Sequence, residues 1–440
     1  MCRARHLRKP RLLFRKQLPT SDPDSPWGSD APVDVHSMLP NALAGAGRTR
    51  HVLAPLIPFP IHARQAHFQI SAHFTNKMKK FEYNVLPSRV IFGSGSVKKL
   101  PAEIERLNVS RPLLLATPGK SNFSNQLSDI IQAAAITIAG TFPHAKAHTP
   151  TSVTEEATAF LASVAADCVV SIGGGSVVGL GKAVSIRTGV PHISVPTTYS
   201  GSEMTPILGE TQNGKKTTRS DPKILPAVVI YDADFTMTLP PAICSTSGIN
   251  AIAHAVEALY ATNANPITSM LALEGIKALA AALLQIVRSP ESKAPREEAL
   301  YGAWLCGAVL GSSSMGLHHK LCHVLGGSFA LPHAETHTVV LPHALSYNAP
   351  AIPEQMAKLA TVFPGSNGDA LRGLELLLQE LGVPRALKDL GMEEGDIEKA
   401  TEIAAGNQYP NPRPLEKQWI RELIRRAWAG ETAKADLCNE

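Results

Sequence analysis

The fold class follows from one segment, CVVSIGGGSVVGLGKAVSI at residues 168–186. Residues 168–172 have the apolar, β-branched composition of a buried strand, and the helical period resumes after three glycines. A strand, a glycine turn and a helix start form an anion site, because glycine lets the backbone approach a phosphate and free helix N–H groups point at it. The G-x-G-x-x-G of an ordinary Rossmann fingerprint is absent, and a triple glycine also occurs as a plain tight turn.

The next strand strengthens the nucleotide-binding interpretation. Residues 192–195 are strand-like, and the loop PTTYSGSE follows them directly at residues 196–203. Two successive strand ends therefore carry small, hydroxyl-rich loops. They lie at the edge where open α/β sheets bind nucleotides.

Strand and helix patterns alternate around this segment, which predicts a parallel sheet. Ser152 and Glu155 have the spacing of a capping box, so we expect a helix to begin there. The expected strands are 89–92, 111–117, 137–142, 168–172 and 192–195, and the expected helices are 97–107, 125–135 and 152–166.

Helical patterns replace strand patterns after Pro240 and Pro241. We therefore expect a Rossmann-like dinucleotide-binding α/β domain at 78–239, an α-helical catalytic domain at 240–430 and a tail at 431–440. The helices expected in the second domain are 249–260, 269–287, 296–310, 318–326, 353–362, 368–381, 395–404 and 415–429.

The first 77 residues form a basic extension. They hold eleven Lys or Arg and four Asp, which leaves 31 basic and 33 acidic residues for the rest of the chain. Their proline, serine and glycine content without periodicity is typical of disorder. The run RLLFRKQL resembles a mitochondrial presequence. We favour Met78 as the natural start, so that residues 1–77 lie outside the working protein.

Composition narrows the class of protein. Hydrophobic residues make up 44% and charged residues 18%, as in a soluble globular chain. The slightly acidic body excludes a nucleic-acid binder on charge grounds. The six cysteines form no C-x-x-C spacing, which favours a reducing compartment and a cytoplasmic protein. The uncharged stretch at 301–318 is broken by glycines, so no membrane span is expected.

Six of the sixteen histidines lie in GLHHKLCHVLGGSFALPHAETHTVVLPH, residues 316–343. In a helix, His319 and His323 share one face, and His333 can fold back toward them after the Gly-Gly break. Upstream, Asn250 and His254 repeat the spacing of four residues. Such a pair can be a hydrogen-bonded core feature. Two converging pairs instead indicate a site that holds a metal or moves protons.

The order and spacing of these motifs resemble the iron-type alcohol dehydrogenase superfamily. The resemblance runs from Phe81 to about Gly430. Finer details, including MKKFEYNVLPSRVIFG, LHHKLCHVLGG, LPHAETH and NPRP, are similar to the maleylacetate reductase group within it. The matching superfamily motifs lie at 92–96, 167–176, 196–203, 231–241, 248–254 and 316–327.

The resemblance implies reduction of maleylacetate to 3-oxoadipate with NADH or NADPH, in the hydroxyquinol branch of aromatic degradation. It also implies a homodimer acting on a small dicarboxylate oxo-acid. A metal-dependent NAD(P) alcohol or polyol dehydrogenase of the same superfamily is the alternative, and a catalytically silent nucleotide-binding relative is a third reading.

The superfamily's metal ligands are an Asp and three His, and they match Asn250, His254, His319 and His333 in this sequence. Asn250 departs from the pattern, because an amide carries no charge and binds transition metals poorly. Three histidines can still hold Zn or Fe with an open position. We favour catalysis that requires no metal, with the histidines as proton and hydrogen-bond donors.

The remaining site residues are also carried over by resemblance. His323 matches the position that faces the nicotinamide, and Tyr199 is a further candidate catalytic residue. No carboxylate follows the second strand, where Lys120 lies near Thr117, so NADPH should be accepted beside NADH. The expected cofactor-binding residues are Thr117, Gly174, Gly175, Ser176, Thr197, Thr198 and Ser202.

Overall fold

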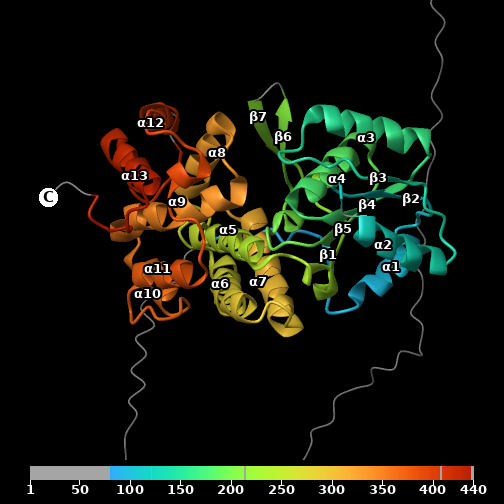
Figure 1. Cartoon of the computed structure of the whole chain (residues 1–440), viewed down its shortest axis with the longest axis horizontal. Helices are drawn as coiled ribbons and strands as arrows, with labels where there is room; N and C mark the ends of the chain where they lie inside the picture. Colours follow the sequence, from blue (N-terminus) through green and yellow to red (C-terminus); the bar gives the residue numbers. More distant parts are fainter. Residues whose placement is uncertain (1–79, 120, 213–214, 407–408, 438–440) are drawn as a thin grey trace, which may run out of the picture. The chain divides into compact units, whose positions relative to one another are not determined.

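The computed structural model describes residues 80–119, 121–212, 215–406 and 409–437 (Figure 1). The predicted extension at 1–77, the proposed start at Met78 and the side chain of Lys120 lie outside these residues. The predicted tail is described as far as Leu437.

The first half of the described chain is built on a six-stranded parallel sheet in the order β1-β8-β5-β4-β2-β3. β4 and β5 are neighbours, and Gly173 lies opposite Pro196, so the two predicted loops leave the same edge of the sheet. This confirms the predicted α/β class. The strands are β1 Arg89–Phe92, β2 Pro112–Leu115, β3 Gly140–Phe142, β4 Cys168–Gly173, β5 His192–Pro196 and β8 Val228–Tyr231.

Helices cover both faces of this sheet (Figure 1). Leu100 of α1 (Leu100–Arg106) and Leu127 of α2 (Ser121–Ala133) share one hydrophobic core with Val170 of the sheet. α3 (Thr151–Ser163) and α4 (Gly175–Thr188) pack in a second core with Val169, the next residue of β4. Because successive strand residues point to opposite faces, the two cores lie on opposite sides.

Some local features of the first half differ from the predictions. α3 begins at Thr151 after Pro150, and no side chain caps it, so the capping box of Ser152 and Glu155 is wrong. Ser152 already lies in the first turn, too late to cap it. No predicted strand matches β8 or the hairpin of β6 (Ile207–Gln212) and β7 (Lys215–Ser220).

The second half is helical, as expected, and packs around two cores. α5, α6 and α7 form the first, and α8, α12 and α13 contribute to the second. α9 lies between them, because Leu341 packs in the first core and Val340 in the second. The helices are α5 Pro241–Leu259, α6 Pro266–Arg288, α7 Lys293–Ser312, α8 Leu317–Phe329, α9 His333–Asn348, α10 Pro353–Ala360, α11 Ala370–Glu380, α12 Asp396–Gly406 and α13 Lys417–Ala429.

α9 is absent from the predicted helices because Pro342 lies inside it. A proline lacks the N–H of the helical ladder and usually ends or bends a helix. Here burial on both sides holds the helix together, since every residue from Thr336 to Asn348 is buried.

α6 is the one helix in the described part of the chain that is long and apolar enough to cross a membrane. Half of its most apolar window is buried within the protein. It packs against α5 and α7 in the first helical core, which is the arrangement of a core helix.

A close approach of two glycines joins the loop after β5 to α7. A Cβ on Gly307 would lie 2.5 Å from the carbonyl oxygen of Gly201, whose φ of +74° also favours glycine. Nearby, Arg296 of α7 donates to the carbonyls of Leu239 and Pro290 and is 1% exposed. The approach of Gly201 to Gly307 holds the loop at 196–203 against α7, and Arg296 links α7 to the segment that ends at Leu239.

Gly307→Ala should destabilise the protein by about 1–3 kcal/mol, because the new methyl group cannot fit without moving the backbone of the 196–203 loop. The measurement is urea unfolding followed by circular dichroism. Gly406→Ala is the matched control, since no atom of the described residues that could clash lies within 4 Å of its added Cβ. Equal stability of the two variants would contradict the close approach.

Candidate active site

A cavity of about 700 Å³ lies where the loops after β4 and β5 meet α5, α8 and α9. Ser176 and Thr198 line it from the sheet, and Asn250, His254 and His319 line it from the helices. The edge of the sheet predicted to bind nucleotide and the predicted histidine cluster therefore face one space.

The cofactor end of the cavity is the start of α4. Gly174 is the N-cap, and no side chain occupies that cap, so the first N–H groups of the helix remain open to a ligand. A Cβ on Gly174 would lie 2.9 Å from Cγ2 of Thr198, and Gly173 has a φ of +153°. Only glycine suits both positions. The turn fits a pyrophosphate, which binds helix N–H groups in this way.

Among the predicted cofactor residues, Gly175, Ser176, Thr198 and Ser202 line the cavity. Gly174 is not among the lining residues, and the backbone N–H of Thr197 donates to the carbonyl of Gly173. Thr117 follows β2 and is not among the lining residues.

The catalytic end is organised by Glu257, a fully buried carboxylate on α5. Its oxygens accept the backbone N–H groups of Gly316 at 3.1 Å and His318 at 2.8 Å, which begin α8. α8 has no N-cap side chain of its own, so Glu257 caps it from another helix. Burial raises the pKa of Glu257, and these N–H donors oppose the rise.

Glu257 also orients a pair of histidines. Its Oε2 lies 2.6 Å from Nδ1 of His319, and Nε2 of His319 lies 2.6 Å from Nδ1 of His254. Burial lowers the pKa of both histidines well below the usual value, which favours neutral rings. His319 then donates to Glu257 through Nδ1. The one N–H of a neutral His254 serves either Nε2 of His319 or the carbonyl oxygen of Ser200, which lies 3.3 Å from Nε2 of His254.

The histidines from α5, α8 and α9 that line the cavity differ in exposure. His323 and His333 are exposed at the mouth, whereas His254, His319 and His337 are buried at the floor. Two lysines and six histidines line the cavity, and no Asp or Glu is among the described lining residues. This lining suits an anionic ligand.

The structure does not bring Tyr199 to the cavity. It is fully buried in the first helical core, and that burial raises the pKa of its phenol. Two residues of the site were missed from the sequence, Glu257 and His337. Spacing alone could have found both, because Glu257 follows His254 by three residues and His337 follows His333 by four, as residues on one helix face do.

The four superfamily ligand positions do not fit a transition metal well. Oδ1 of Asn250 is buried and has no hydrogen-bond partner in the described part of the chain, but it is a neutral amide oxygen. The facing nitrogens of His254 and His319, 2.6 Å apart, are closer than two ligands each about 2.0–2.1 Å from a tetrahedral zinc would be. The nearby carboxylate, Glu257, is on the far side of His319.

Comparison with known proteins gives consistent matches along the described chain. A family model for iron-containing alcohol dehydrogenase matches residues 87–233, and one for the C-terminal part of the Fe-containing alcohol dehydrogenase family matches residues 244–428. A maleylacetate reductase of Rhizobium sp. is 50% identical over 80% of this chain and 99% of its own length. One from Burkholderia cepacia is 48% identical over the same shares.

Solved structures of maleylacetate reductases and iron-containing alcohol dehydrogenases have the same fold as this chain. The crystal structure of maleylacetate reductase from Rhizobium sp. strain MTP-10005 has a TM-score of 0.77 at 49% identity, covering 81% of this chain and 100% of that one. An iron-containing alcohol dehydrogenase from Corynebacterium glutamicum has a TM-score of 0.77 at 37% identity, covering 82% and 100%.

Glu257→Gln should lower the free energy of unfolding by about 1.5–3 kcal/mol, because it replaces a charged acceptor of buried N–H groups and places amide hydrogens against some of them. Urea unfolding measures the change. In the control, Glu375→Gln removes a partly exposed ion pair with Arg385 and should cost about 0–1 kcal/mol. A Glu257→Gln variant as stable as this control would show that the carboxylate does not hold α8.

Proposed function

The chain belongs to the iron-containing alcohol dehydrogenase family, and we propose that it reduces maleylacetate to 3-oxoadipate with NADH or NADPH. One observation supports this most directly: a helix start that suits a pyrophosphate and a cluster of imidazoles without a lining carboxylate face one cavity. An anionic cofactor and a dianionic substrate both suit that lining.

The reaction needs a hydride, a proton and a way to hold negative charge on oxygen. Bound NADH or NADPH supplies the hydride. It adds to the alkene carbon farther from the ketone, and the electron pair moves onto the ketone oxygen as an enolate. A proton then reaches the carbon beside the ketone, which completes 3-oxoadipate and leaves both carboxylates unchanged.

The histidine cluster would stabilise the enolate. Donors fixed in advance contribute most, because they do not reorganise as charge develops. Glu257 fixes His319, and His319 in turn fixes His254 through their 2.6 Å contact. We assign the proton to His254 or His323, which line the cavity at its floor and its mouth. Lys320, exposed at the mouth, adds positive charge for the substrate.

Acceptance of both cofactors is part of the proposal. No carboxylate follows β2 in the sequence to repel a 2′-phosphate. Parallel assays with NADH and NADPH compare the two directly.

His254→Ala and His319→Ala should each lower kcat/KM for maleylacetate on the order of 100- to 1000-fold, because the first removes a fixed donor and the second removes the ring that positions it. The assay follows NADH absorbance in purified protein. His343→Ala is the control, because His343 is buried on α9 but does not line the cavity. Near-normal turnover in both cluster variants would remove the cluster from the chemistry.

We also propose that the reaction requires no metal, because the ligand set lacks its carboxylate. Turnover of the wild type should survive dialysis against a chelator, and elemental analysis should find no stoichiometric zinc or iron. Asn250→Asp should restore a charged ligand and raise zinc retention, whereas Asn265→Asp, at the cap of α6, should not. Activity lost with chelator and recovered with Zn²⁺ or Fe²⁺ would contradict this proposal.

A further inference from the structure

His337 is a buried polar side chain that has no role in the proposed reaction. It lies one turn after His333 on α9, lines the cavity and is 1% exposed. Neither Nδ1 nor Nε2 has a hydrogen-bond partner among the described residues. Burial and neighbouring imidazoles lower its pKa well below the usual value, so the ring offers one N–H donor.

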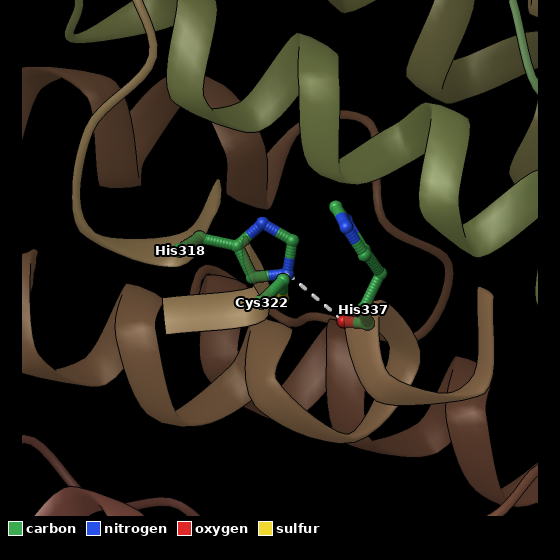
Figure 2. A group of neighbouring side chains, drawn as sticks. All are labelled: His318, Cys322 and His337. Carbon is green, nitrogen blue, oxygen red and sulfur yellow. Dashed lines mark hydrogen bonds between the residues drawn. The ribbon is translucent and has the colours of Figure 1, made fainter. Parts of the chain in front are cut away.

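The position of His337 is fixed through its backbone. Figure 2 shows the ring of His318 directed at the carbonyl oxygen of His337, with 2.9 Å between Nε2 and that oxygen. The ring of His337 itself points away from this bond. A helix held in this way presents the imidazole at a set place on the cavity floor.

A metal shared by His318, Cys322 and His337 is the competing interpretation, since their donor atoms lie within 4.8 Å of one another. The hydrogen bond argues against it. Nε2 of His318 donates to the carbonyl of His337, so it carries a proton there and has no lone pair for a metal. His337 therefore remains to be satisfied by something that enters the cavity.

The side chains packed around His337 are imidazoles, and the buried carboxylate of Glu257 beside them is already bonded to His319 and to the start of α8. The ring centroids of His318, His319 and His333 lie 4.9, 5.0 and 4.3 Å from that of His337. A buried donor without a partner is unfavourable, and an anionic oxygen is the acceptor that it binds most strongly. The absence of Asp and Glu from the described lining leaves room for an incoming anion.

The shape of maleylacetate indicates which of its two carboxylates would reach His337. This step rests on the proposed function. Maleylacetate is linear with a carboxylate at each end, and the carbon that accepts hydride is next to one of them. That end must stay near the nicotinamide, so the ketone and the other carboxylate extend toward the histidine end. The terminal group that reaches a cavity floor first is this second carboxylate.

We propose that His337 donates a hydrogen bond to the second carboxylate of the substrate, the one on the ketone side of the alkene. This bond selects dicarboxylates over monocarboxylates. His337 is a specificity residue in this role, because the bond is made equally before and during hydride transfer. Its loss should raise KM and leave kcat largely unchanged.

The test compares two substrates that differ only in that carboxylate: maleylacetate and 4-oxo-2-pentenoate. His337→Phe keeps a flat ring and removes the donor. It should raise KM for maleylacetate on the order of 10- to 100-fold, the loss expected for a hydrogen bond to a charged group, and lower kcat/KM for 4-oxo-2-pentenoate by a much smaller factor. His337→Asn, which keeps an N–H donor, should recover part of the preference.

Binding of the matching products, 3-oxoadipate and levulinate, gives a readout that needs no turnover. Wild type should bind 3-oxoadipate more tightly, and His337→Phe should abolish the difference. His343→Asn, on the same helix outside the cavity, controls for loss of a buried histidine. Thermal unfolding of each variant checks that it is folded.

The outcomes separate the two proposals. Equal loss for both substrates, or an unchanged preference in His337→Phe, overturns the role of His337 even if wild type reduces maleylacetate. If wild type reduces neither substrate, the proposed reaction fails. A binding preference for 3-oxoadipate that depends on His337 would still support the carboxylate contact.

Discussion

The carboxylate of Glu257 is the constraint on which the catalytic half depends. It is fully buried on α5, yet its partners are the first N–H groups of α8 and the ring of His319. One side chain thus caps a helix, fixes the register of α8 against α5 and selects which nitrogen of His319 faces the cavity. A buried carboxylate tolerates this position only because donors surround it.

This constraint ties fold and chemistry together across the cavity. The sheet supplies backbone N–H groups at the start of α4, and the helices supply imidazoles from α5, α8 and α9. Each end offers donors to negative charge, one through a helix terminus and the other through rings. The tight contact of Gly201 with Gly307 fixes the position of the loop at 196–203, which lies between the two ends of the cavity.

Much of the α/β half could be predicted because its signals are local. Uninterrupted β-branched residues mark β4, and the glycines after it mark the turn into α4. α9 could not be predicted in this way, since Pro342 contradicts a helix and only burial on both sides overrides it. The spacing of Glu257 after His254 marks its place on the helix face, but its capping of α8 could not be predicted, because most of its partners are backbone N–H groups about sixty residues away.

Asn250 has a consequence for how such a site changes over generations. It lies on the cavity wall with its carbonyl oxygen unpartnered, beside histidines that α5 and α8 hold in place. Codons for asparagine and aspartate differ at a single base. A lineage carrying this site could therefore exchange a neutral amide for a charged ligand by one point mutation while the helices stay as they are. Under the proposed metal-free reaction, the amide at position 250 is therefore the residue whose exchange would most directly change how the site meets a cation.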